Sequence, residues 1–330
     1  MVDASVVHPW VADRGRIRFG VVLPGGVDWP VVHDRAQAAE DLGFDSVWLP
    51  DHPLMGWDSW TQLAAVAAVT TRIRLGAMVS CVYYRNPVLL ARVVADVDRI
   101  SGGRVILGLG SGDMQWEFEQ MGLVYPPAKE RAVLLEAALR IIPALLNGER
   151  VDADGATFSV RGARLDPPAL QQPHVPVLVA GGGERTTLRL AAMYADASNM
   201  GAASWAGGAF TPEDAKRKLE VLHSHCQSAG RPDAAVLKTA QIGFTLAETS
   251  EQADAIRAQR EANPAMRQML DFLQGIPNFC TPAEAVARLT SWKLAGFEYF
   301  VGGLGASVEA LEFFARNVMR PVVEASLSTA

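Results

Sequence analysis

Short apolar segments and longer helix-like segments alternate along almost the whole chain. Eight runs are typical of β-strands, at residues 19–23, 46–49, 73–79, 105–109, 177–180, 196–200, 237–246 and 299–301. Helical patterns or helix starts separate most of them, as at 30–42, 60–70, 87–100 and 128–146. Eight strands alternating with helices predict a (β/α)8 TIM barrel; the alternative, a doubly wound open sheet, fits the strand count less well.

Composition and length fit one barrel with insertions. The chain has 330 residues, of which 49% are hydrophobic and 20% charged, and its net charge is -6. No break in composition marks a linker, so we expect a single domain over residues 1–330, with 1–15 as an N-terminal tail. Residues 149–170 alternate polar and apolar and predict an inserted hairpin, whereas 261–279 give no clear pattern.

Several classes of function are disfavoured by what the sequence lacks. There is no basic run for nucleic acid, no apolar run near the ~20 residues of a membrane span, and no basic start typical of a signal peptide. Three unevenly spaced cysteines and the pair His223 and His225, two residues apart, favour neither a disulfide framework nor a metal site. We therefore expect a cytoplasmic protein without a metal.

The segment 175–187 has the pattern of a strand, a glycine turn and a helix. A β-branched apolar run ends at Ala180, then Gly181, Gly182 and Gly183 follow without interruption, and a helical pattern begins at 184. Glycines let the backbone turn sharply and come close to a ligand. The N-terminus of the next helix offers free N–H groups and a positive dipole end, and Thr186 adds a hydroxyl. This pattern predicts a phosphate cradle.

Asp51 and His52 directly follow the second predicted strand. Ligands of a barrel bind at the carboxyl ends of its strands. An imidazole exchanges a proton near neutral pH, and a neighbouring carboxylate can tune it. The alternative is that Asp51 only caps a turn while His52 packs in the core. The position at a strand end favours a catalytic role for the pair.

The fourth predicted strand runs into the glycine-rich segment 108–112. A dinucleotide-binding motif needs glycine at its sixth position, where this chain has Asp113, so we expect only a tight turn that lets the backbone approach a ring. Asp113 and Glu117 are four residues apart and share a face if this element is helical. One of them could act as a general acid. Alternatively, both are solvated acidic residues in the first turn of a helix, where the helix dipole favours negative charge.

Four tryptophans fall near the same rim of the predicted barrel. A flat ring system would stack well on side chains of this kind, although core packing explains any one of them equally well. The four are Trp48, Trp57, Trp60 and Trp116, and Trp116 is the one that we predict to contact a cofactor.

In their order and spacing, several segments resemble the bacterial-luciferase-like flavin and deazaflavin oxidoreductases, across nearly the whole chain. The segments are the stretch 36–52 that ends in Pro50-Asp-His52, Arg72-Ile-Arg-Leu-Gly76, Arg85-Asn-Pro87, the stretch 103–112, Glu130-Arg131 and the stretch 176–183. The resemblance implies a TIM barrel that holds the ring at its strand ends, against Asp51 and His52. It implies the cofactor phosphate at Gly181, Gly182, Gly183 and Thr186, and a bulge, often with a non-prolyl cis peptide, at Ala77, Met78 and Val79.

The Asp-His pair looks most like the branch that uses coenzyme F420, a deazaflavin. That resemblance implies hydride transfer between the ring and a small organic substrate. His52, oriented by Asp51, would exchange a proton with a substrate oxygen, and Asp113, where the family usually has glutamate, would assist. Cations are expected along the exit for the cofactor's acidic tail; the candidates, which surface salt bridges explain as well, are Arg185, Lys216, Arg217 and Lys238.

Two other functions stay open from the sequence. One is an FMN-dependent monooxygenase that works with a flavin reductase, and the other is a non-catalytic protein that binds a flavin or deazaflavin. The family resemblance also implies a homodimer. The pattern does not identify the substrate, whose pocket we expect to be shaped by the loop after the third strand, the hairpin at 149–170 and the segment 261–279.

Overall fold

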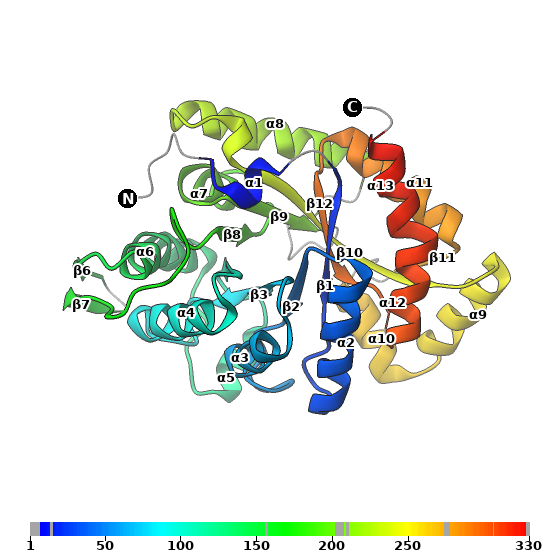
Figure 1. Cartoon of the computed structure of the whole chain (residues 1–330), viewed down its shortest axis with the longest axis horizontal. Coiled ribbons are helices and arrows are strands. Elements are labelled where there is room, and N and C mark those ends of the chain that lie inside the picture. The colour runs from blue at the N-terminus through cyan, green and yellow to red at the C-terminus, as the bar shows by residue number, and fades with distance from the viewer. Residues whose placement is uncertain are drawn as a thin grey trace.

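Eight parallel strands close into a barrel in the computed structural model, which describes residues 7–13, 16–155, 158–201, 208, 211–273, 278–305 and 307–327. Each strand pairs with the next, and the last pairs with the first (Figure 1). The predicted TIM barrel is confirmed, and the doubly wound sheet is wrong. In order around the barrel the strands are β1 (Arg18–Val22), β2 (Ser46–Leu49), β3 (Arg74–Ala77), β5 (Val105–Gly110), β8 (Val177–Ala180), β9 (Ala197–Gly201), β10 (Leu237–Leu246) and β12 (Tyr299–Gly303).

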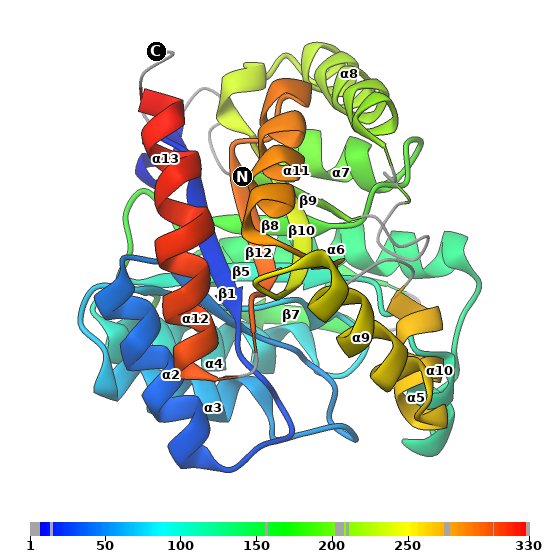
Figure 2. The ribbon, with the colours of Figure 1, turned by 90° about the vertical axis from the view of Figure 1, so that its right-hand side faces the viewer.

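Helices surround the barrel and cover its outer face (Figures 1 and 2). Three of them end at glycines in the left-handed conformation, Gly43 with φ 85°, Gly102 with φ 71° and Gly296 with φ 118°, as helix C-caps commonly do. The outer helices are α2 (Trp29–Leu42), α3 (Ser59–Val69), α4 (Pro87–Ser101), α6 (Ala128–Leu146), α7 (Thr187–Tyr194), α8 (Pro212–Ser228), α11 (Pro282–Ala295) and α12 (Val308–Phe314), which runs through a π-helical turn, Ala315–Met319, into α13 (Arg320–Leu327).

Further elements lie outside the basic repeat. The predicted hairpin is present and packs against α6. The segment without a clear pattern contains the end of α9, then α10, then β11, which extends the sheet beside β10; residues 274–277 are outside the described ranges. The added elements are α1 (Pro9–Ala12), β4 (Ser80–Cys81), α5 (Gln115–Gln120), β6 (Val151–Asp154), β7 (Ser159–Ala163), the 3-10 turn Asp233–Ala235, α9 (Ser250–Glu261), α10 (Pro264–Leu273) and β11 (Asn278–Cys280).

The amino-terminal end of the barrel is closed by α1. Trp10, only 1% exposed, packs with Trp48 and Tyr299 in a cluster formed by inward-facing strand residues. Its indole N–H donates to Asp45, which stands just before β2. The expectation of a tail over residues 1–15 is therefore wrong for 8–12, because these residues gain burial against the barrel interior; residues 1–6 and 14–15 lie outside the described part.

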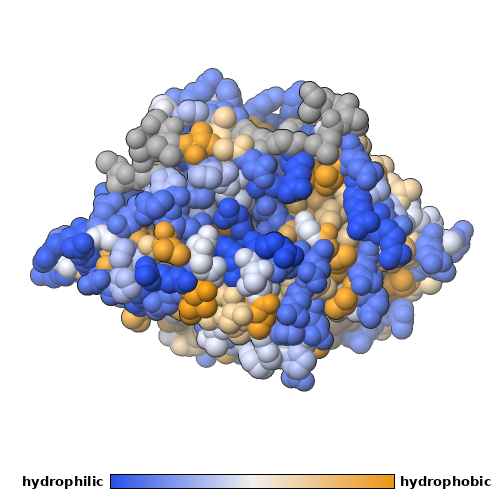
Figure 3. All heavy atoms as spheres, viewed as in Figure 1, coloured by the Kyte–Doolittle hydropathy of each residue, from blue (hydrophilic) through white to orange (hydrophobic). Residues whose placement is uncertain are grey.

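Strand burial follows from this arrangement. All four residues of β2 and all six of β5 are buried, since one face of a barrel strand points inward and the other meets a helix. The face of the molecule in Figure 3 is mainly hydrophilic, with apolar side chains scattered over it. Among the described residues, none of the helices combines the length and the apolar character needed to cross a membrane.

Candidate active site

The carboxyl ends of the strands surround a cavity of about 300 Å³. It receives residues from seven barrel strands or the loops that follow them, which is where barrel enzymes bind their ligands. Larger cavities occur elsewhere, but this one gathers a histidine, two aspartates and a tyrosine. Its lining is Val22, Pro50, Asp51, His52, Met55, Met78, Val79, Cys81, Tyr84, Gly110, Ser111, Gly112, Asp113, Met114, Ala180, Gly181, Asn199 and Gln241.

The His52 side chain is 22% exposed and is bonded through one ring nitrogen. Its Nδ1 lies 2.9 Å from Oε2 of Glu117, a fully buried residue of α5. Nε2, the other ring nitrogen, has no hydrogen-bond partner among the described residues. His52 therefore keeps one nitrogen for a ligand while the other is held in place.

Asp51 makes a different set of contacts from the one that we expected. Both of its oxygens accept from Nη1 of Arg85, at 2.7 and 3.0 Å, and one also accepts from Oγ of Ser59, at 2.8 Å. The backbone N–H of Cys81 is a third donor and adds a fourth hydrogen bond, at 3.2 Å. The prediction that Asp51 orients His52 is thus wrong: a buried carboxylate needs a cation, and Arg85 supplies it on the side of the β4–α4 loop.

Asp113 lies at the cavity but outside the helix. The α5 helix begins at Gln115, so the expected helical face shared by Asp113 and Glu117 is not formed. Burial raises the pKa of the Asp113 carboxyl, nearby Glu117 adds to the effect, and His52 opposes it. Asp113 consequently keeps a proton to higher pH than an ordinary aspartate. Burial also raises the pKa of the Cys81 thiol to about 12, so this side chain stays neutral.

The predicted bulge between β3 and β4 lies beside these groups, because β3 stands between β2 and β5 in the barrel. The Met78–Val79 peptide bond is cis, as the resemblance implied, and both residues line the cavity. Glycines on β5 make this packing possible: a Cβ on Gly108 would overlap the Ala77 carbonyl oxygen, and one on Gly110 would lie 2.5 Å from Val79 Cγ2. The glycine-rich segment of β5 therefore admits the bulge, whereas we had expected it to approach a ring.

Two side chains of α8 hold the triple-glycine turn from behind. Lys218 Nζ donates to the carbonyl oxygen of Gly182 at 2.8 Å, and His225 Nε2 lies 2.8 Å from that of Glu184. In a trans peptide the carbonyl and the next N–H point in opposite directions. The N–H groups of Gly183 and Arg185 are therefore directed away from α8.

The turn also lacks room for side chains. Gly181 has φ 120° and lines the cavity, and a Cβ on it would lie 3.1 Å from Thr187 Cγ2; a Cβ on Gly183 would lie 3.1 Å from Thr187 Oγ1. The helix starts at Thr187, three residues later than predicted, with Thr186 as its N-cap residue and no capping bond from that side chain. The glycine backbone of the turn can thus be approached without obstruction from a Cβ, while the N–H of Gly181 is already bonded to the Asn199 carbonyl oxygen at 2.9 Å.

Some predicted residues do not join the cavity. Trp116 is 42% exposed on α5 and is not part of the described lining, so its expected stacking role is not supported. Trp48 and Trp60 are core residues. Lys238 bonds Asp233 at the start of β10, which is the opposite end of the barrel, and Arg217 pairs with Glu184.

The sequence matches a known protein family over most of its length. The family model described as luciferase-like monooxygenase matches residues 17–299. The chain belongs to this family. One relative of the chain, an F420-dependent glucose-6-phosphate dehydrogenase of Microbacterium testaceum, is 32% identical over 302 residues, covering 81% of the chain and 85% of the relative.

Other matches are partial or structural. A 5,10-methylenetetrahydromethanopterin reductase of Archaeoglobus fulgidus is 31% identical over 180 residues, so the chain spans about half of that relative: 52%, with 54% of the chain covered. The F420-dependent tetrahydromethanopterin reductase structure from Methanopyrus kandleri has a TM-score of 0.78 at 21% identity, covering 93% of the chain and 99% of the reductase. The structure of an F420-dependent secondary alcohol dehydrogenase with an F420–acetone adduct has a TM-score of 0.78 at 20% identity, covering 94% of the chain and 99% of the dehydrogenase. These structures share the barrel fold.

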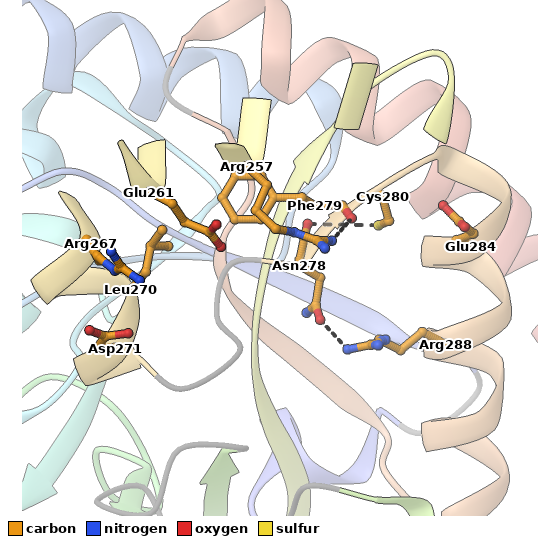
Figure 4. A pocket seen from close by; sticks show the side chains of 10 residues that line it. All are labelled: Arg257, Glu261, Arg267, Leu270, Asp271, Asn278, Phe279, Cys280, Glu284 and Arg288. Carbon is orange, nitrogen blue, oxygen red and sulfur yellow. Dashed lines mark hydrogen bonds between the residues drawn. The ribbon is translucent and has the colours of Figure 1, made fainter. Parts of the chain in front are cut away.

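The luciferase-like chain has a second cavity, of about 600 Å³, between α9, α10, β11 and α11 (Figure 4). There Arg257 donates to the Phe279 carbonyl oxygen and lies over that ring, while Arg288 bonds Asn278 from the opposite side. The described part of 261–279 thus lines this cavity and not the one at His52. The hairpin residues 151–154 likewise line a separate cavity beside α6, so only the loop after β3 meets our expectation.

Proposed function

We propose that this protein is a coenzyme F420-dependent oxidoreductase that transfers hydride between the deazaflavin ring and a small organic substrate. One observation carries the proposal: His52 and Asp113 face one cavity at the strand ends, beside Met78, Val79 and Gly181. The names of several relatives, which are F420-dependent dehydrogenases and reductases, support the same cofactor.

The residues around the cavity fit a ring with a phosphorylated arm. Met78 and Val79 offer an apolar wall, with Asp51 and His52 at the neighbouring strand end. The arm would extend over Gly181, Gly182 and Gly183 towards Thr186, where backbone N–H groups and the start of α7 favour an anion. Lys218 adds a buried positive charge behind the turn.

The proposed chemistry divides between the cofactor and the chain. When bound, the deazaflavin supplies a ring carbon that accepts or gives up a hydride. His52 Nε2 exchanges a proton with the substrate oxygen. Burial raises the pKa of Asp113, so this carboxyl keeps a proton to higher pH than an ordinary aspartate and would be a second proton donor in the same cavity. The enclosing strand ends and loops limit the access of water to the reacting groups.

Titration of the purified protein with F420 and with FMN tests the cofactor. Ring reduction is then followed with a panel of alcohols, alongside oxygen uptake with reduced FMN. We expect tighter binding of F420, and reduction of its ring without oxygen uptake. Preferential FMN binding with oxygen consumption would support the monooxygenase with its reductase, and binding without any turnover would support the non-catalytic binder. The homodimer stays a prediction, for which light scattering is the measurement.

A further inference from the structure

Glu117 lies behind His52 and gathers three hydrogen bonds on one buried carboxylate. Oε2 is 2.9 Å from His52 Nδ1 and accepts from the Tyr84 hydroxyl at 2.9 Å. Oε1 accepts from the backbone N–H of Leu54 at 3.0 Å. The side chain is fully buried and is not part of the cavity lining, so a ligand in the cavity meets His52 and not Glu117.

The donors around Glu117 determine where the histidine proton resides. An ionised carboxylate can only accept hydrogen bonds, and a backbone N–H can only donate. The short contact to His52 is therefore an Nδ1–H donating to Glu117, which leaves Nε2 of the neutral ring as an acceptor. Leu54 and Tyr84 restrain the carboxylate itself, so the geometry is defined from three directions.

We propose that Glu117 is the positioning residue of the site: it fixes the Nδ1–H tautomer of His52 and stabilises the charged ring that forms when Nε2 takes up a proton. The catalytic part of this proposal rests on the proposed function. With an alcohol as substrate, the hydroxyl O–H bond would break as its proton passes to Nε2, the C–H hydrogen would leave with the bond's electron pair as a hydride that a bound deazaflavin would accept, and a C=O bond would form. In the reverse reaction the hydride adds to the carbonyl carbon and the proton to the carbonyl oxygen.

Asp51 does not have this role although it is adjacent to His52 in the sequence. Its oxygens are engaged by Arg85, Ser59 and the Cys81 N–H. A charged partner buried against an imidazole strengthens the hydrogen bond because little water screens it. The residue that affects proton exchange at His52 is therefore the one 65 positions away in the sequence.

The first test measures the tautomer in the cofactor-free protein. Nitrogen-15 NMR of labelled histidine, with His52→Gln used for assignment, distinguishes a protonated from an unprotonated ring nitrogen. We expect a protonated Nδ1 and an unprotonated Nε2 at neutral pH. The opposite tautomer would overturn the proposal whether or not the protein turns over F420. The expected tautomer in a protein that lacks F420 turnover would instead count against the proposed function alone.

The second test compares Glu117→Gln with Glu119→Gln, an exposed glutamate on the same helix. For Glu117→Gln we expect kcat/KM to fall about 100-fold, as for other partners that orient a functional histidine, with an unchanged Kd for F420. The acidic limb of the pH profile for alcohol oxidation moves to lower pH, because the charged ring loses its counter-ion. Glu119→Gln should match the wild type.

A Tyr84→Phe variant keeps the proposal testable if Glu117→Gln does not fold. It removes one donor to Glu117 and should shift the acidic limb in the direction opposite to Glu117→Gln, since the carboxylate then interacts more strongly with His52. An unchanged pH profile in both variants would contradict the positioning role. A loss of F420 binding with an unchanged profile would indicate a structural role only, and would also contradict it.

Discussion

Each end of the barrel contains an acid that accepts hydrogen bonds from several donors: Glu117 is fully buried, whereas Asp45 is partly buried and borders a cavity of about 240 Å³. At the amino-terminal end Asp45 accepts from Trp10 at 3.2 Å and from Tyr299 at 2.9 Å, and α1 closes the space above them. At the carboxyl end Glu117 accepts from three donors, and one of them, His52, opens onto about 300 Å³. The feature that distinguishes the carboxyl end is His52, a partner of the acid that can exchange a proton and keeps one ring nitrogen for the cavity.

His52→Ala should produce the largest effect at the carboxyl end. We expect kcat/KM to fall by about 10²–10⁴, the range for loss of a general acid–base group, with the melting temperature nearly unchanged because the side chain borders a cavity. Steady-state kinetics and calorimetry measure the two quantities. His33→Ala, on the exposed surface of α2, is the control. Unaltered turnover would remove His52 from the mechanism.

Trp10→Ala should produce the opposite result at the amino-terminal end. The indole is fully buried and donates to Asp45, so we expect a loss of about 3–5 kcal/mol in the free energy of unfolding. Activity per folded molecule should stay the same. Urea unfolding gives the stability, and Trp116→Ala, at an exposed position, should change it by less than about 0.5 kcal/mol. A similar loss in both variants would contradict the closure of the barrel by α1.

Acidification should lower the free energy of unfolding through His8, which lies at the amino-terminal end of the barrel. Burial lowers the pKa of His8 from its ordinary 6.5 to about 4, so between these values the unfolded chain binds a proton that the folded chain does not. The contribution of His8 to stability is thus present above pH 6.5 and is lost as the pH falls towards 4. Between pH 7 and 5 we expect His8 to account for about 2 kcal/mol of lost unfolding free energy.

Urea unfolding of His8→Gln at both pH values measures this difference, because glutamine does not titrate. The variant should lose less stability on acidification than the wild type, while His33→Gln, on the surface, should follow the wild type. Equal losses in wild type and His8→Gln would show that His8 is not buried as a neutral ring.

Of the four changes predicted at His52, Trp10, His8 and Gly181, Gly181→Ala should have the smallest effect, and that effect should be confined to the glycine turn. Its φ of 120° is unfavourable for alanine, and the new Cβ would lie 3.1 Å from Thr187. We expect about a tenfold weaker Kd for F420, measured by fluorescence titration, from backbone strain of about 1–3 kcal/mol. Gly303→Ala, where a Cβ meets no atom within 4 Å, is the control at the same rim. Equal affinities would place the phosphate elsewhere.

The repeating elements were largely predictable from local pattern. The expected strands at 46–49, 177–180 and 237–246 and the helix at 128–146 have the observed bounds, because each is a continuous apolar or amphipathic run between turn residues. Residues 261–279 were not readable, since α10 is short and packs on α9, and β11 is a three-residue strand that pairs with the end of β10. Among the site residues, His52, Asp113, Val79 and Gly181 were predicted and share one cavity.

The sequence alone determined the barrel, the strand ends at which chemistry-bearing residues gather, and the glycine turn, because periodicity and backbone conformation are local properties. Which side chains contact one another depends on how distant segments fold together. Asp51 pairs with Arg85, Glu117 with His52, and Lys218 with the Gly182 carbonyl, across 34, 65 and 36 positions. A buried charged or polar group must pair with a donor or acceptor that the fold brings close to it. Because these pairs join residues far apart in the chain, no local sequence pattern predicts them.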